Sequence, residues 1–129
     1  MGVLMKKKIL VIDDEKGSRD LFVYLLEPEG YEVKAARDGL EGLEMFKNDI
    51  FDIIFLDVHM PNMNGPETLR AIKQIRPEQA VVIFSSSLDS SLSFETQSKK
   101  MGACACLYKP VDINDILQLV KNSGSSSHD

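Results

Sequence analysis

The sequence contains no tryptophan, only two cysteines, and no apolar run long enough to cross a bilayer. Cys104 and Cys106 lie two positions apart, which is poor geometry for a disulfide, and no further cysteine completes a zinc set. We expect both to be buried structural thiols. The N-terminal lysines follow a very short apolar stretch, which is the reverse of a secretory signal. We therefore expect a cytoplasmic protein without membrane insertion.

Basic residues are also fewer than acidic residues. The 129 residues include 15 lysines and arginines against 20 acidic residues, which gives a formal net charge of −5. Such a field repels nucleic acid, so we expect no direct contact with nucleic acid. Hydrophobic residues make up 43% and charged residues 27%, which is typical of one globular domain. We place that domain at residues 1–122, and predict that the Ser/Gly-rich residues 123–129 are a disordered tail, a linker stub or a cloning scar.

Five short segments are predicted to be β-strands because they are rich in apolar residues and stop at polar ones. Three of them are continuous apolar runs, which is typical of a parallel sheet covered on both faces. The five segments are Ile9–Ile12, Tyr31–Ala35, Phe51–Leu56, Ala80–Phe84 and Cys104–Tyr108.

Apolar residues spaced three and four apart predict helices after the strands. The stripes are Leu21, Phe22 and Leu25; Leu40, Leu43 and Phe46; Leu69, Ile72 and Ile75; and Ile113, Ile116, Leu117 and Val120. Pro28–Gly30 closes the first helix, Pro66 suits the start of the third, and Asp112 suits the N-cap of the last. A serine-rich fourth helix around Leu88–Phe94 has low intrinsic helicity, so it is a candidate for a segment that shifts. The alternation of five strands with five helices predicts a doubly wound α/β sandwich.

Polar side chains follow the predicted strands at the end where an open parallel sheet binds ligands. Asp13 and Asp14 follow the first strand, and Asp57 follows the third. Ser85 follows the fourth strand, and Lys109 follows the fifth. Each residue alone has an ordinary explanation as a helix cap, a loop aspartate, a helix-start serine or a surface lysine. Their joint placement indicates a site.

Three carboxylates in contact destabilise a fold unless positive charge offsets them. Two like charges about 4 Å apart repel by about 4 kcal/mol at an effective dielectric constant of about 20. A hard divalent cation such as Mg²⁺, held by Asp13, Asp14 and Asp57, offsets this repulsion and keeps positions free for phosphate oxygens. Lys109 adds positive charge from the other side. The pattern therefore predicts a magnesium pocket built to receive a phosphoryl group.

The motifs that carry these residues resemble those of a known family. They are Ile12–Glu15, Leu56–Gly65, Ser85–Ser86 and Tyr108–Pro110. Together they are similar to the signature set of response-regulator receiver domains in two-component signalling, and Asp57–Gly65 resembles the version in the chemotaxis regulator. The resemblance runs from about Lys6 to Asn122. It implies a flavodoxin-like fold with strand order 2-1-3-4-5 and five helices on two faces.

The resemblance implies a phosphorylation-activated switch rather than an enzyme, catalysing only its own phosphotransfer and slow dephosphorylation. Asp57 would accept the phosphoryl group from a sensor histidine kinase or a histidine phosphotransfer protein. Ser85 and Lys109 would each contact a phosphoryl oxygen. Output would reach a downstream protein through the fourth helix, fifth strand and fifth helix, from a monomer or a weak phosphorylation-dependent dimer.

The resemblance also assigns the ligands of Mg²⁺. Asp14 and Asp57 would bind the ion directly, Asp13 would act through water, and the backbone carbonyl of His59 would be the third direct ligand. We interpret the His59 imidazole as a group that tunes hydrolysis of the acyl phosphate rather than as a metal ligand.

One position departs from the family pattern. Many receivers carry an aromatic residue three positions before the signature lysine, and here Cys106 stands in that place. Strand alternation places Tyr108 on the same side of the strand as Cys106. Our hypothesis is that Tyr108 partly replaces the missing aromatic residue, or that signalling depends more on the fourth helix.

Other functional classes fit the sequence less well. A receiver excised from a longer, DNA-binding regulator has the same motifs. A Mg²⁺-dependent phosphatase of the haloacid-dehalogenase type needs a second aspartate where this chain has His59. A flavodoxin-like FMN binder needs a phosphate-binding first loop, whereas Asp13–Glu15 repels phosphate. A pseudo-receiver that is not phosphorylated would not need the complete acidic set.

Overall fold

The computed structural model describes residues 6–58, 64–85, 96 and 98–123. Its elements in chain order are β1 (Lys8–Ile12), α1 (Lys16–Leu26), the short 3-10 helix η1 (Glu27–Glu29), β2 (Glu32–Ala36), α2 (Gly39–Lys47), β3 (Ile53–Asp57), α3 (Gly65–Ile75), β4 (Val81–Ser85), β5 (Ala105–Tyr108) and α5 (Ile113–Asn122). Residues 96 and 98–100 are also helical and belong to the fourth helix. The serine-rich stretch predicted for that helix, Leu88–Phe94, lies outside the described residues.

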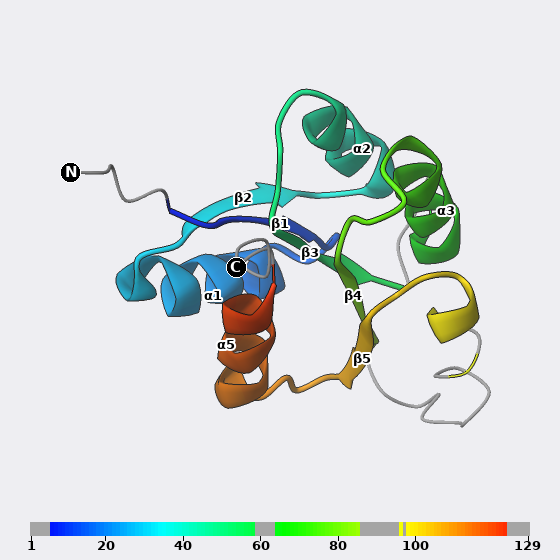
Figure 1. Ribbon diagram of the computed structural model, residues 1–129. Helices are drawn as coiled ribbons and strands as arrows, with labels where there is room; N and C mark the ends of the chain where they lie inside the picture. Colours follow the sequence, from blue (N-terminus) through cyan, green and yellow to red (C-terminus); the bar gives the residue numbers. More distant parts are fainter. Residues whose placement is uncertain (1–5, 59–63, 86–95, 97, 124–129) are drawn as a thin grey trace.

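The strands form one parallel sheet in the order β2-β1-β3-β4-β5 (Figure 1). Every residue of the central strands β3 and β4 is buried, whereas β2 and β5 at the edges are mostly half-buried. The continuous apolar runs of the sequence therefore correspond to the strands covered on both faces. The predicted doubly wound fold and its 2-1-3-4-5 order are confirmed.

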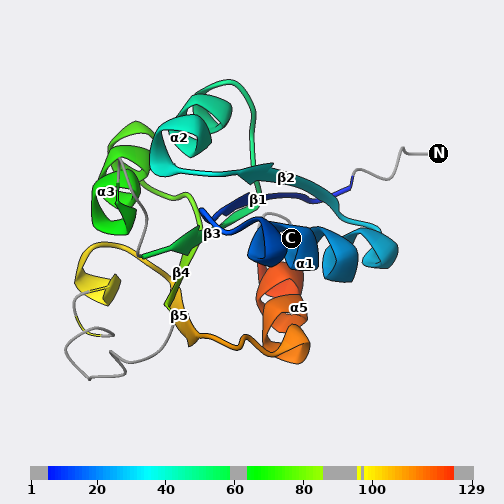
Figure 2. The same cartoon turned by 180° about the vertical axis from the view of Figure 1, so that it is seen from behind.

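Alternation along the strands divides the core into two layers. On β1, Leu10 and Ile12 pack under α2 and α3, while Ile9 and Val11 pack under α1 and α5. Figures 1 and 2 show these two pairs of helices on opposite faces of the sheet. Both faces of the sheet are thus occupied by helices, so the rim at the strand ends is the place left for chemistry.

Capping residues determine where the helices begin and end. Asn64 precedes α3 and forms a capping box with Glu67, which satisfies backbone N–H groups at the start of that helix. Asp112 caps α5 through a bond from the N–H of Asn114, as predicted. Gly30 closes the first helical segment with φ of 96°, a left-handed conformation that glycine adopts without a steric penalty.

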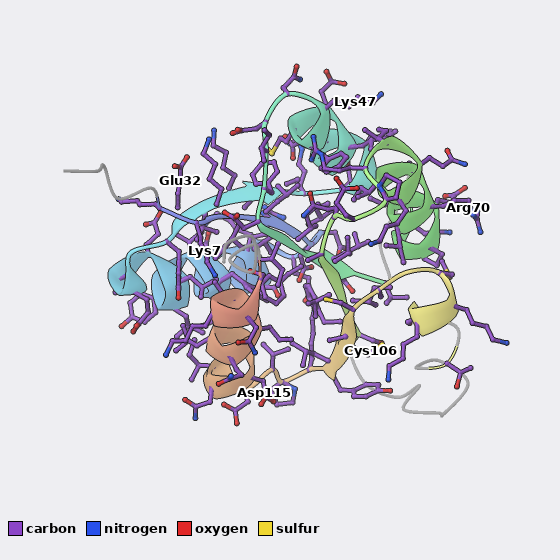
Figure 3. The ribbon with its side chains drawn as sticks, in the orientation of Figure 1. Lys7, Glu32, Lys47, Arg70, Cys106 and Asp115 are labelled. Atoms are coloured by element: carbon purple, nitrogen blue, oxygen red, sulfur yellow. The ribbon has the colours of Figure 1, made fainter. Side chains whose placement is uncertain are left out.

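Two details differ from the sequence interpretation. Cys104 is exposed rather than buried, because it lies in the loop before the edge strand β5. Cys106 lies on β5 (Figure 3) and is only half-buried. Ser123, assigned to the tail, is buried, and its hydroxyl donates to the carbonyl oxygen of Val120 at 2.7 Å. Residues 124–129 lie outside the described residues.

Lys7, directly before β1, forms hydrogen bonds to the end of the last helix. The ammonium group of Lys7 donates to the carbonyl oxygens of Val120, Lys121 and Ser123 at 2.8, 3.0 and 2.6 Å (Figure 3). These are carbonyl groups at the end of α5, where a cation interacts favourably with the helix dipole.

In the described part of the chain, no helix is long and apolar enough to span a membrane.

Candidate functional site

Three carboxylates converge at the carboxyl ends of β1 and β3. Each of Asp13, Asp14 and Asp57 offers an oxygen, and these oxygens all lie within 4.8 Å of one another. Asp13 and Asp57 are buried and Asp14 is exposed. The structure thus brings together the predicted acidic set. The alternative of a helix cap for Asp13 or Asp14 is wrong, because Glu15 is the N-cap of α1.

Lys109 faces this cluster from the end of β5. Its ammonium nitrogen lies 3.3 Å from Asp13 Oδ2 and 3.8 Å from Asp57 Oδ2. It also lies 3.2 Å from Glu15 Oε1 and 5.3 Å from the centre of the Phe84 ring. One cation is therefore shared among three carboxylates and an aromatic face, which leaves the site with an excess of negative charge.

The electrostatic environment keeps Asp13 and Lys109 charged. Burial by itself raises the pKa of Asp13, but bonds from Ser18 and from the backbone N–H of Glu15, with the charge of Lys109, lower this pKa overall. Burial by itself lowers the pKa of Lys109, but the charges of Asp13 and Asp57 and the bond to Glu15 raise this pKa overall. Asp13 is thus a carboxylate and Lys109 an ammonium group at neutral pH.

The carboxylate set suits a divalent metal. Carboxylate oxygens are hard ligands, and three of them within 4.8 Å of one another match the donors that hard divalent cations bind in proteins. The backbone of His59, predicted to supply a further ligand, lies outside the described residues.

Ser85 is the last residue of β4 and is buried. The carbonyl oxygen of Ser85 accepts a hydrogen bond from the backbone N–H of Lys109 at 2.7 Å. The carbonyl oxygen of Phe84 accepts one from the backbone N–H of Val58 at 3.0 Å. Within the described residues, Ser85 is joined to the charged cluster by this backbone bond. The sheet register therefore places the predicted hydroxyl, carboxylate and ammonium residues on adjacent strand ends.

Gly65 holds the start of α3 against the backbone that follows Asp57. A Cβ atom at position 65 would lie 2.7 Å from the Cα of Val58 and 2.8 Å from the carbonyl oxygen of Asp57. The Gly65 N–H donates to the carbonyl oxygen of Val58 at 3.2 Å. The backbone at these positions cannot move aside as a flexible side chain can, so only glycine fits here.

Three residues near the site were missed by the sequence reasoning. Glu15 pairs with Lys109, Ser18 bonds the carboxylate of Asp13, and a guanidinium nitrogen of Arg19 donates to the Asp13 carbonyl oxygen at 2.8 Å. All three belong to the N-cap and first turn of α1, which directly follows the acidic pair. The one available signal was their position within six residues of Asp13.

An apolar hollow of about 390 Å³ adjoins Lys109. Leu21 and Phe22 of α1, Phe84, and the chain after β5 form its wall. Leu21 is 46% exposed at the edge of this hollow. The hollow lies between α1 and the segment Pro110–Val111, directly beside the acidic site.

Comparisons with known proteins agree with this geometry. The family model of the response regulator receiver domain matches residues 9–121. Sporulation initiation phosphotransferase F of Bacillus subtilis is 34% identical over 118 residues, which are 92% of this chain and 94% of that protein. The chain is also similar to transcriptional regulatory proteins such as ZraR of Klebsiella oxytoca and CpxR of Escherichia coli, of which it spans 24% and 50%.

Solved structures give the same result. A CheY-like receiver domain protein from Methanospirillum hungatei superimposes with a TM-score of 0.83 at 33% identity, covering 91% of this chain and 92% of that one. A response regulator from Burkholderia pseudomallei, solved with a phosphorylated aspartic acid and a calcium ion, gives a TM-score of 0.81 at 26% identity, covering 91% and 68%. The chain belongs to the response regulator receiver domain family, so it is a phosphorylation-activated signalling module rather than a catalytic enzyme.

Proposed function

We propose that Asp57 is the phosphoacceptor of this receiver. One observation carries the proposal: a buried carboxylate at the end of the central strand β3 lies within 3.8 Å of an ammonium group and beside two further carboxylates. A carboxylate oxygen of Asp57 attacks phosphorus in a phosphohistidine. A P–O bond forms, the P–N bond breaks, and the imidazole nitrogen leaves with the electron pair.

The neighbouring residues bind and orient the phosphoryl group. Lys109 pairs with one phosphoryl oxygen, and the hydroxyl of Ser85, on the next strand end, donates to another. Asp14, Asp57 and the backbone carbonyl of His59 would hold Mg²⁺ directly, and Asp13 would hold it through water. The bound ion would neutralise charge on the carboxylates and on the phosphoryl oxygens. The phosphorylated aspartic acid and the calcium ion named for the Burkholderia pseudomallei regulator support both assignments.

The phosphodonor is a sensor histidine kinase or a histidine phosphotransfer protein. Family membership and the similarity to a sporulation phosphotransferase support a role within a phosphorelay, and the family supports a cytoplasmic location. We place the donor over the hollow between α1 and Pro110–Val111. An apolar surface there, with Leu21 exposed at its edge, offers a partner buried contact next to the reacting carboxylate.

The output face comprises the fourth helix, β5 and α5. Cys106 and Tyr108 lie on the same face of the edge strand β5, and both are half-buried. In the sheet register Tyr108 lies beside Ser85, the residue proposed to contact the phosphoryl group. This pairing supports Tyr108, rather than Cys106, as the side chain that responds to phosphorylation. A downstream protein then recognises the altered face.

Labelling with a small phosphodonor tests the assignment. Wild-type protein incubated with acetyl phosphate and Mg²⁺ should gain one phosphoryl group that hydroxylamine removes, as expected for an acyl phosphate. Asp57→Asn should gain none. Asp52→Asn is the matched control, because Asp52 precedes the same strand at its opposite end and should be labelled normally. Equal labelling of Asp57→Asn would contradict the proposal.

A further inference from the structure

Glu15 contacts Lys109 in a way that sets it apart from the other carboxylates. Its Oε1 atom lies 3.2 Å from the ammonium nitrogen, the shortest of the three ion-pair distances to Lys109. The side chain of Glu15 is 68% exposed, whereas those of Asp13 and Asp57 are almost completely buried. Glu15 therefore reaches Lys109 from the solvent side.

Glu15 also lies outside the carboxylate set that suits a metal ion. Asp13 and Asp57 belong to that set, so a bound cation shares their negative charge with Lys109. Glu15 is not a member of this carboxylate set, so a cation bound there leaves the ion pair between Glu15 and Lys109 in place. Once a cation is bound, Glu15 is thus the anion that still competes for this ammonium group.

We propose that Glu15 regulates the site by competing with the phosphoryl group for Lys109. The inference rests on the proposed function, in which Lys109 pairs with a phosphoryl oxygen. An arriving phosphoryl group must displace the Glu15 carboxylate from the ammonium group or share the group with it. The unphosphorylated state is stabilised by this contact, so Glu15 weakens phosphoryl binding and limits the fraction of phosphorylated protein.

The size of the effect follows from the exposure of Glu15. An ion pair at an exposed position changes an equilibrium constant by a factor of about 1.5 to 5. Removing the carboxylate should therefore tighten binding of a phosphoryl mimic by that factor. Added salt screens exposed charges, so the difference should shrink as ionic strength rises.

Glu15→Gln is a suitable variant because it removes the charge and keeps the backbone contacts. The backbone N–H of Glu15 donates to Asp13 Oδ1 at 3.0 Å, and this bond does not depend on the side chain. Glu15→Asp keeps a negative charge near the site but shortens the side chain and withdraws it from Lys109. Asp20→Asn, on the same helix, removes a carboxylate from another exposed ion pair, with Lys16 at 2.7 Å.

The experiment measures the affinity of each variant for beryllofluoride in the presence of Mg²⁺, by NMR titration, and then the extent of labelling by acetyl phosphate. We expect Glu15→Gln and Glu15→Asp to bind beryllofluoride about 1.5 to 5 times more tightly than wild type, and Asp20→Asn to match wild type. The thermal unfolding midpoint of each variant without metal checks that the fold is unchanged.

The outcomes separate the two proposals. If wild-type protein neither binds beryllofluoride nor accepts a phosphoryl group, the proposed function is wrong. If wild type does both, equal or weaker binding by Glu15→Gln overturns the role of Glu15. A gain by Glu15→Gln that Asp20→Asn shares, or that Glu15→Asp lacks, also overturns it, because net or local charge would then be the cause.

Discussion

Asp57→Asn should make the metal-free protein more stable, although it removes a buried ion pair. In the structure, Asp57 repels Asp13 and Asp14 over distances of at most 4.8 Å and attracts Lys109 at 3.8 Å. At an effective dielectric constant of about 20, each repulsion costs about 3.5 kcal/mol and the attraction contributes about 4.4 kcal/mol. The repulsions exceed the attraction, and the exposure of Asp14 reduces the difference to about 1–2 kcal/mol.

Thermal unfolding followed by circular dichroism measures this effect. A domain of this size gains about 4 °C in Tm for each kcal/mol, so Asp57→Asn without metal should melt about 4–8 °C above wild type. Excess Mg²⁺ should raise the Tm of wild type, because a ligand that binds only the folded state stabilises it. The variant lacks one ligand carboxylate, so Mg²⁺ should raise its Tm much less.

Asp52→Asn provides the control for this experiment. Asp52 Oδ2 accepts from the backbone N–H of Lys8 at 2.8 Å, at the opposite end of the sheet from the acidic site. Its variant should not gain stability and should respond to Mg²⁺ as wild type does. The reasoning is refuted if metal-free Asp57→Asn melts below wild type, or if Mg²⁺ stabilises both proteins equally.

Three further predictions concern the surroundings of Asp57. Leu21→Glu places a charge in the apolar hollow and should slow phosphotransfer from a histidine phosphotransfer protein tenfold or more (about 1.4 kcal/mol), while the rate of labelling by acetyl phosphate stays unchanged. The control Leu40→Glu, at another exposed apolar position, should leave both rates unchanged. Gly65→Ala forces the backbone of residues 57 and 58 to shift, so it should weaken both Mg²⁺ binding, measured by calorimetry, and labelling by acetyl phosphate. A Cβ atom at Gly17 meets open space, so Gly17→Ala should change neither quantity. The pKa of Asp13 is lowered in the folded state, so its ionised form stabilises the fold; this contribution is complete above pH about 4 and is lost as pH falls through the folded pKa. In urea unfolding at decreasing pH, the free energy of unfolding should therefore fall less for Asp13→Asn than for wild type.

The sequence was sufficient for the sheet and for the residues at its rim. Parallel strands buried on both faces need nearly continuous apolar side chains, and short runs that stop at polar residues are typical of such strands, so Phe51–Leu56 and Ala80–Phe84 were recognisable. Chain order then places Asp13, Asp57 and Lys109 at the same edge, because crossovers in such sheets bring all the strands to run in one direction. Local signals also marked Asp112 as a cap.

Contacts between distant or differently oriented elements needed the tertiary structure. The pairing of Glu15 with Lys109 joins residues 94 positions apart, and the bond from Lys7 to Val120 joins residues 113 positions apart. No local pattern specifies either contact, because a long exposed side chain can adopt many conformations at little difference in energy. The exposure of Cys104 depended likewise on where the edge strand begins, which is a boundary that sequence patterns place poorly.

The amino-acid sequence by itself therefore determined the family, the parallel α/β fold and the acidic rim, since these follow from hydrophobic periodicity and from side chains placed directly after strands. Only the tertiary structure decided how the single ammonium group of Lys109 is divided among its carboxylate neighbours, and that Gly65 is the residue that fits against the backbone of Asp57. The physical reason is that these interactions depend on distances of a few ångströms between separate elements, which are set by how the whole core packs.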